Sequence, residues 1–307
     1  MGRHPTFLKI LEGIFGTSRN KPDLHHGEDL LFLGRYQEAL LFFKRVLEND
    51  PQNIHALSGI ALSLEHLERN KDAIAVYRRI LSIDADNSDA LLGMAICLEK
   101  TGRFEDALSW YENDLKKNPG APDILVGIGR CCFELKRYQD ALRNFESALM
   151  QYPDFLDAWI GKGNTLFHMA RYEDAAECFG KILELHHEDA GTWVALGRCM
   201  SHLGRFEQAI TCFEKATELD PGNVAAWFEK GLCLAGWRRN TEAIRAYDRV
   251  LDLDPACGAA YYEKGYSLEI LGKEAEAAKC YEKARMHGHS SAQSRVHYHF
   301  INGYSFY

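Results

Sequence analysis

The chain has 307 residues, of which 46% are hydrophobic and 26% charged, a composition typical of a folded protein rather than a disordered tail. Its formal net charge of −8 disfavours nucleic-acid binding, because that binding depends on cations that neutralise phosphates. There is no run of about 18 apolar residues, so no membrane span is expected.

Residues 1–19 precede the regular part of the sequence. Thr6–Phe15 predicts an amphipathic helix with an apolar side, and we expect it to cap the first repeat. Lys9 and Glu12 interrupt the apolar stretch, which argues against a signal peptide. Gly2 and Thr6 fit the loose pattern for myristoylation, and membrane contact through this segment is the alternative to capping. The sequence does not decide whether Gly2 is acylated.

Residues 20–289 repeat with a period of 34 residues, without insertion or deletion. We number the positions of each repeat from 1 to 34. Position 20 is alanine in every repeat, position 24 is always aromatic and position 8 is always glycine or alanine. The repeats begin at Asn20, Ile54, Ser88, Pro122, Leu156, Ala190, Val224 and Gly258.

Each repeat predicts two helices. Small or apolar residues recur at positions 4, 7, 8 and 11, and again at 20, 24, 27 and 28, which is the spacing of one helical face. Glycines at position 15, such as Gly102, suit a left-handed residue just after the first helix. Prolines at position 32, such as Pro119, are expected to end the second helix.

These columns resemble the tetratricopeptide repeat (TPR) family, and the resemblance covers residues 20–289. It implies an all-α fold: an α-solenoid of eight helix-turn-helix repeats in a right-handed superhelix, with the first helices lining a concave groove. In such proteins the groove is the usual surface for partners. Ala85, His187 and His289 depart from the family by standing where proline is usual, and Asp114 occupies an apolar position.

The nine cysteines fall mostly into the packing columns, at positions 10 and 23, and no CxxC motif occurs. We therefore expect buried, reduced thiols and a cytoplasmic location. No nucleophile elbow, phosphate-binding loop or HExxH motif is present. The sequence accordingly predicts neither an enzyme nor a cofactor.

Two columns of polar residues suggest sites but have simpler explanations. Position 13 holds His66, His168 and His202, yet neighbouring helices about 8–10 Å apart place two imidazoles too far apart for one metal ion. We expect solvated histidines and no metal site. Position 16 is a column of cations, with acids at position 19 of most repeats, and we expect these to neutralise each other rather than bind a ligand.

A second stripe on the first helices, away from the core positions, is expected by the resemblance to face the groove. Arg130 and Arg198 flank Asn164 and are suited to hold the carboxylates or carbonyl groups of a partner. The alternative is that each arginine bonds a neighbouring acid, such as Asp123 or Glu134. The predicted groove residues are Leu92, Val126, Arg130, Phe133, Ile160, Asn164, Phe167, Val194, Arg198 and Phe228.

Position 6 of the same helices holds four successive glycines: Gly59, Gly93, Gly127 and Gly161. Each costs about 0.5–1 kcal/mol relative to alanine inside a helix. Two explanations stay open: a ligand backbone approaches them, or a neighbouring helix packs closely there. The carboxylate-binding clamp of some TPR modules does not map onto the chain, because its positions in the first repeat hold Leu24, His25 and Glu28.

Residues 290–307 are rich in aromatic residues and lack the charge of a polar cap. They could fold over the last repeat, enter the groove or dock on another copy of the chain. The function that the sequence predicts is a non-catalytic scaffold that binds a peptide or helix of a partner protein in the groove. The alternatives are self-assembly as a homo-oligomer through the terminal segments and, less favoured by the acidic charge, RNA binding.

Overall fold

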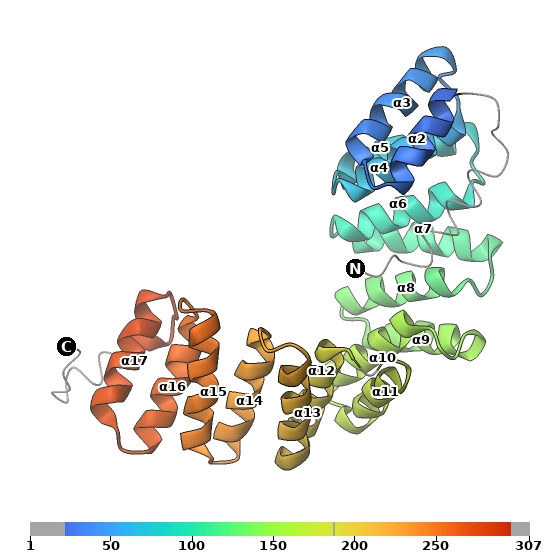
Figure 1. The fold of residues 1–307 in the computed structure, drawn as a ribbon. Coiled ribbons are helices and arrows are strands. Elements are labelled where there is room, and N and C mark those ends of the chain that lie inside the picture. The colour runs from blue at the N-terminus through green and yellow to red at the C-terminus, as the bar shows by residue number, and fades with distance from the viewer. Residues whose placement is uncertain (1–21, 187, 296–307) are drawn as a thin grey trace. The chain divides into compact units, whose positions relative to one another are not determined.

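The computed structural model describes residues 22–186 and 188–295 of the chain. All regular structure in these residues is helical, in sixteen helices, α2 to α17, that follow one another as antiparallel pairs (Figure 1). The all-α prediction is therefore confirmed. The expected N-terminal helix at Thr6–Phe15 lies outside the described residues, as does most of the segment 290–307.

Each helical pair consists of a first and a second helix. The first helices are α2 (Pro22–Phe32), α4 (Ile54–His66), α6 (Ser88–Lys100), α8 (Pro122–Glu134), α10 (Leu156–His168), α12 (Ala190–His202), α14 (Val224–Gly236) and α16 (Gly258–Ile270). The second helices are α3 (Tyr36–Asn49), α5 (Asn70–Ile83), α7 (Phe104–Lys117), α9 (Tyr138–Gln151), α11 (Tyr172–Leu185), α13 (Phe206–Leu219), α15 (Asn240–Leu253) and α17 (Glu274–Met286). From α4 onward, each first helix begins at the residue assigned to repeat position 1.

The ends of the helices follow from the residues that were expected to set them. Gly102 has φ +76°, and the amide of Arg103 donates back to Leu98 O at 2.9 Å, which closes the end of α6. Where glycine is missing, as at Lys136, another residue adopts the same positive φ. Pro119 lies two residues beyond the end of α7. At the start of α6, Asn87 Oδ1 accepts from the Ala90 amide at 3.0 Å.

The aromatic ring at repeat position 24 joins each repeat to the next. Phe145 is buried, and its ring lies against Gly129 of its own repeat and Gly161 of the following one. A Cβ atom on either glycine would come within 3 Å of the ring. Ala141 at position 20 is fully buried beside it. A single repeat therefore cannot bury its own apolar side, and the repeats stabilise one another by stacking.

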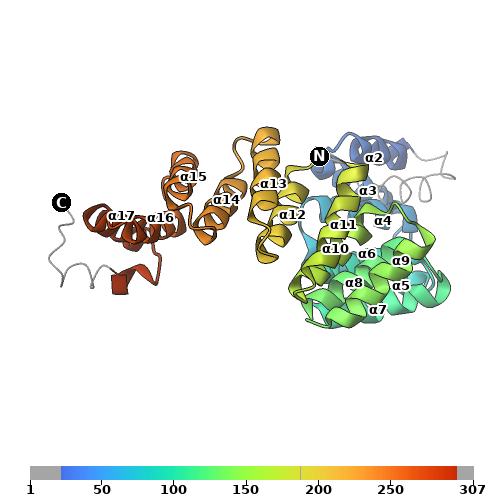
Figure 2. The same ribbon diagram turned by 90° about the horizontal axis from the view of Figure 1, so that it is seen from below.

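The helices divide into two compact units, unit 1 up to Thr165 and unit 2 from Leu166. In unit 1, one continuous cluster of buried residues runs from Leu24 to Ala158. In unit 2, separate clusters surround Phe213 and Tyr281. Figure 2 shows the pairs α12/α13, α14/α15 and α16/α17 of unit 2, whose helices contact each other along their lengths. None of the helices in the described residues has the length and apolar character that crossing a bilayer requires.

Candidate functional site

Two connected cavities in unit 1 form the candidate site. The first, of about 420 Å³, extends over α4, α6, α8 and α10 and is bordered by the apolar residues Leu62, Leu92 and Ile96. The second, of about 590 Å³, continues along α8 and α10. The two cavities share Glu99, Lys100, Arg130 and Asp157. We call them together the unit-1 groove.

The periodicity of α6 explains how one helix serves both the core and the groove. Leu91, Met94 and Leu98 are at most 1% exposed and belong to the core face. Leu92 and Ile96, one turn apart on another face, are half-buried and border the groove. α6 thus presents one apolar face to its neighbouring helices and a second, more solvent-accessible face to the groove.

A half-buried glutamate on α4 begins a polar row across the groove. Glu65 accepts a hydrogen bond from the Tyr77 hydroxyl of the same repeat, and its other oxygen lies 4.0 Å from Lys100 Nζ of the next repeat. Burial raises the pKa of Glu65, although the hydrogen bond from Tyr77 and the Lys100 charge act to lower it. The pKa of Tyr77 is also raised, first by burial and then by the Glu65 charge.

The next repeat builds the same arrangement with a tighter ion pair. The Tyr111 hydroxyl donates to Glu99 Oε2 at 2.9 Å. Arg130 from the following repeat donates from Nε to Glu99 Oε1 at 2.7 Å and from Nη2 to Oε2 at 3.2 Å. Burial acts to lower the pKa of Arg130, but the hydrogen bonds and charge of Glu99 raise it overall. Arg130 therefore binds Glu99 across the repeat boundary.

Aspartates at repeat position 2 form a further row along the groove. They lie in the first turns of three successive first helices, where a negative charge also interacts favourably with the helix dipole. The pKa of Asp89 is raised by burial and by the nearby Asp114 charge. All three are half-buried and border the first cavity: Asp89, Asp123 and Asp157.

The structure places six of the predicted site residues at the unit-1 groove. Leu92, Val126 and Arg130 border the first cavity, although Val126 is only 1% exposed and belongs mainly to the core. The second cavity is bordered by Arg130, Phe133, Ile160 and Asn164. Glu65, Glu99 and the aspartate row were not predicted as groove residues from the sequence. A signal for the glutamates was present, since position 12 is glutamate in three of the four repeats with tyrosine at position 24.

The other four predicted residues lie in unit 2. Arg198 lies over the ring of Phe167, 4.7 Å from its centroid, and its Nε is 3.4 Å from Glu229 Oε1. Val194 and Phe228 are half-buried and pack against the core cluster around Phe213.

Both arginines bond acids from adjacent repeats. Each arginine therefore pairs with an acid of the protein itself, as the alternative expected, and contact of the arginines with a partner stays a prediction. The acids are Glu99 and Glu229 rather than Asp123 or Glu134.

The glycine column at position 6 is explained by packing. Gly93 and Gly127 each face the ring of the tyrosine in the preceding repeat, Tyr77 and Tyr111 respectively. A Cβ on either glycine would lie within 3 Å of ring atoms. The ring occupies the space beside each glycine, so the close approach of a ligand backbone is not needed to explain these residues.

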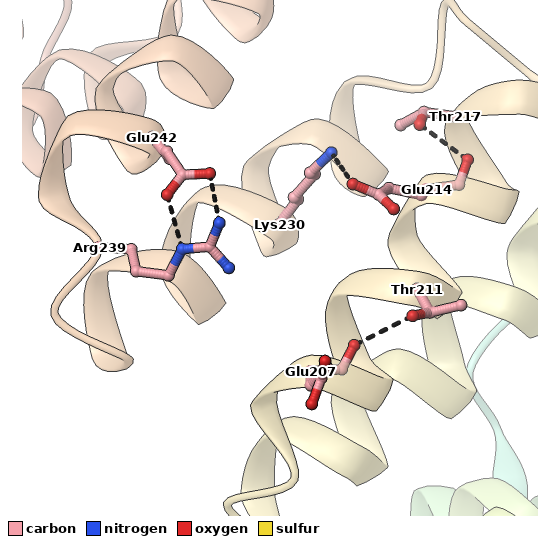
Figure 3. Close-up of polar contacts among 7 residues, drawn as sticks. All are labelled: Glu207, Thr211, Glu214, Thr217, Lys230, Arg239 and Glu242. Carbon is pink, nitrogen blue, oxygen red and sulfur yellow. Dashed lines mark hydrogen bonds and ion pairs between the residues drawn. The ribbon is translucent and has the colours of Figure 1, made fainter.

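The expected neutralisation of the position-16 cations is confirmed. Seven of them pair with the acid three residues later, and Figure 3 shows Arg239 and Glu242 doing so, with Nε to Oε1 at 2.6 Å. Arg205, where position 19 holds Gln208, instead lies 3.9 Å from Glu173. Figure 3 also shows Lys230 of α14 extending to Glu214 of α13, at 2.9 Å, which is a further ion pair between repeats.

Histidines and cysteines serve packing in this structure. His66 stacks on Tyr36, and His202 on Tyr172, with ring centroids 4.4 and 4.5 Å apart. All nine cysteines are free thiols, eight of them buried, and burial raises the pKa of Cys199 to about 12. Among the described residues, no group of three His, Cys, Asp or Glu side chains is arranged to hold a metal ion.

Stacked pairs of antiparallel helices joined by a recurring aromatic ring define a helical-repeat protein. The tetratricopeptide repeat family matches residues 24–90, 133–196, 190–223 and 237–292, and the family of anaphase-promoting complex, cyclosome, subunit 3 matches residues 66–148. The chain is a tetratricopeptide repeat protein. No curated protein matches the sequence.

Three of the solved structures that are similar to the chain are the following. A tetratricopeptide repeat protein from Parabacteroides merdae is 16% identical, with 81% of this chain and 99% of that chain covered and a TM-score of 0.64. YrrB, described as a TPR protein with an unusual peptide-binding site, is 22% identical over 60% of this chain and 95% of its own, with a TM-score of 0.51. The APC/C hetero-tetramer Cut9-Hcn1 is 14% identical over 95% of this chain and 58% of that one, with a TM-score of 0.60. These likenesses are in fold alone.

Proposed function

We propose that the chain is a non-catalytic scaffold that binds a segment of a partner protein in the unit-1 groove. The observation that carries the proposal is the groove itself, which crosses the first helices of four successive repeats. A surface of this length suits a peptide or a helix better than a small metabolite.

The composition of the groove supports this proposal. Leu92, Ile96 and Ile160 leave apolar surface accessible, which is costly in a free protein and commonly marks a contact surface. The hydrogen-bonded rows around Glu65 and Glu99 hold the groove in shape before a partner arrives, so little order would have to be gained on binding. The similarity in fold to YrrB, whose description names a peptide-binding site, is in keeping with this class of function.

Photo-crosslinking tests the proposal at single positions. A photoreactive phenylalanine analogue would replace Leu92 in the groove or, as a control, Arg143 on the second helix α9, whose side chain is exposed. We expect a partner segment to be crosslinked from position 92 and not from position 143. The segment found by mass spectrometry is then synthesised and titrated into the unlabelled protein. Equal labelling from both positions, or a segment that does not bind in the titration, would contradict the proposal.

Exposed apolar residues in the last helical pair favour self-association as a second candidate function. Tyr266, Ile270 and Leu271 on and after α16 are 42–53% exposed. Light scattering over a range of protein concentrations measures the oligomeric state. We expect an increase in mass with concentration that is lost when residues 291–307 are deleted, whereas a constant monomer mass would exclude this candidate.

The buried thiols support a reducing compartment, and we propose a cytoplasmic location. Fractionation of the source cells tests this, and recovery of the chain outside the cytoplasm would contradict it.

A further inference from the structure

The charges that line the unit-1 groove bear on which class of partner segment it can bind, an inference that rests on the proposed function. Acidic side chains outnumber permanent cations along its walls. The carboxylates are Glu65, Asp89, Glu99, Asp123, Glu134 and Asp157, against the cations Lys100 and Arg130.

The two cations are already engaged within the protein. Lys100 lies 4.0 Å from Glu65, and Arg130 donates two hydrogen bonds to Glu99. His66, the remaining basic residue of the groove, stacks on Tyr36, and burial and the Lys100 charge lower its pKa. The field of the groove is therefore negative, and the half-buried position of Asp89 limits screening by solvent.

The negative charge is arranged in register with the apolar surface. On each of three successive helices an aspartate at repeat position 2 is followed one turn later by an apolar residue at position 5, on the same side of the helix. The pairs are Asp89 with Leu92, Asp123 with Val126, and Asp157 with Ile160. The groove thus carries an acidic row with one step per repeat. Beside it, Leu92 and Ile160 leave apolar surface accessible, whereas Val126 between them is only 1% exposed.

We infer that the unit-1 groove binds a basic, amphipathic segment of a partner protein, with Lys or Arg side chains facing the aspartate row and apolar side chains facing the accessible surface of Leu92, Ile96 and Ile160. The binding chemistry is charge complementarity beside apolar burial, so nucleic acids and acidic peptides are disfavoured here. Because the charged contacts are partly exposed, the affinity is expected to fall as salt rises.

Fluorescence anisotropy with synthetic peptides tests the inference. Labelled peptides of about 15 residues are long enough, even as helices, to span three repeats about 10 Å apart. Three peptides share one pattern of leucines and differ only in the polar positions, which are lysine, glutamine or glutamate. We expect the lysine peptide to bind at least about tenfold more tightly than the glutamine peptide, and the glutamate peptide to bind more weakly still.

Two protein variants distinguish binding in the groove from non-specific attraction by the net negative charge of the chain. The groove variant carries Asp89→Asn, Asp123→Asn and Asp157→Asn. The outer variant removes the same three charges from exposed glutamates on the second helices α3 and α7: Glu48→Gln, Glu105→Gln and Glu112→Gln. We expect the groove variant to weaken binding of the lysine peptide about tenfold and the outer variant to change it less than about twofold. Circular dichroism checks that both remain folded.

The outcomes separate this inference from the proposed function. Equal loss in both variants would assign the binding to non-specific attraction and overturn the inference. If the glutamine peptide binds as tightly as the lysine peptide, and the crosslinked segment also binds, the groove is a peptide site without charge selection. If none of the three peptides binds and the crosslinked segment does not bind either, both the inference and the proposed function are wrong. Tighter binding after deletion of residues 296–307 would make this chain's own tail the occupant.

Discussion

In unit 1, α6, α8 and α10 carry an aspartate at repeat position 2 and a glycine at position 6, whereas α14 and α16 of unit 2 carry alanine and glutamate at the same positions. Position 20 is alanine and position 24 is aromatic in both units: Ala107 and Tyr111 are buried in one, as Ala243 and Tyr247 are in the other. Stacking therefore constrains the core columns throughout, while the groove columns are free to diverge. The repeats of unit 1 are the ones whose groove face carries both the acidic row and the cavities described above.

The largest expected difference between the units is the effect of replacing a helical glycine by alanine on stability. Gly127→Ala in unit 1 places a methyl group against the Tyr111 ring, and overpacking costs about 1–3 kcal/mol. The higher helix propensity of alanine offsets this cost by at most about 1 kcal/mol. We expect a net loss of up to about 2 kcal/mol in the free energy of unfolding, measured by urea denaturation.

Gly180→Ala in α11 of unit 2 is the matched control. Apart from the backbone of its own helix, no atom lies within 4 Å of the added Cβ, so the change in helix propensity is the main expected effect. We expect stabilisation by about 0.5–1 kcal/mol. If both alanine variants were stabilised, the packing explanation for the unit-1 glycines would be wrong and the close approach of a ligand would regain support.

The arginines of the two units provide the second comparison. Arg130→Ala removes two of the three hydrogen bonds to the half-buried Glu99 and leaves only the one from Tyr111. We expect a loss of about 1–2 kcal/mol after allowing for partial exposure of the guanidinium group. Arg198→Ala breaks a single, longer ion pair and should cost about 0.5 kcal/mol or less. Thermal denaturation measures both.

Adding Glu99→Gln to Arg130→Ala removes the orphaned charge and should recover part of the loss. An equal loss of stability in Arg130→Ala and Arg198→Ala would show that the bidentate geometry of the Arg130–Glu99 pair does not contribute to stability.

The tyrosines of position 24 provide a third comparison. The Tyr111 hydroxyl donates to Glu99, whereas the buried Tyr247 hydroxyl has no hydrogen-bond partner among the described residues. In the repeat of Tyr247, position 12 is Ala235 instead of a glutamate. Tyr111→Phe should lose about 1 kcal/mol of stability, and Tyr247→Phe should be neutral or slightly stabilising. Differential scanning calorimetry of the two variants compares them. A loss of stability in Tyr247→Phe would reveal a partner for that hydroxyl.

The smallest predicted effect depends on pH. Because burial raises the pKa of Glu65, its carboxylate opposes folding above that pKa, and stability falls as pH rises from the ordinary value of 4.5 through the raised value. Glu65→Gln should therefore stabilise the protein by about 0.5–1 kcal/mol at pH 7 and by nothing below about pH 4. Urea denaturation across this range measures the difference, with Glu105→Gln as an exposed control. A gain that is constant with pH would exclude titration of Glu65 as its cause.

The repeat period predicted the fold closely because its strongest columns are the core columns. Ala141, Phe145 and Gly102 each have a single structural role that recurs in the sequence at a fixed position. The groove was less predictable, because its contacts join different repeats. The spacing of Arg130 placed it on the stripe away from the core, and the family resemblance assigned that stripe to the groove, but its bond to Glu99 depends on how α8 packs beside α6. The glycines were ambiguous for the same reason, since the ring that fills their space comes from the preceding repeat.

Hydrogen exchange of the complex with the crosslinked partner segment tests the central claim most directly. Amide exchange would be followed by mass spectrometry in the free protein and with saturating segment. The account predicts slower exchange in α4, α6, α8 and α10 of unit 1, with α9 and the helices of unit 2 unchanged. Protection confined to unit 2 or to the second helices, with none in α6 and α8, would contradict the assignment of the unit-1 groove as the binding site.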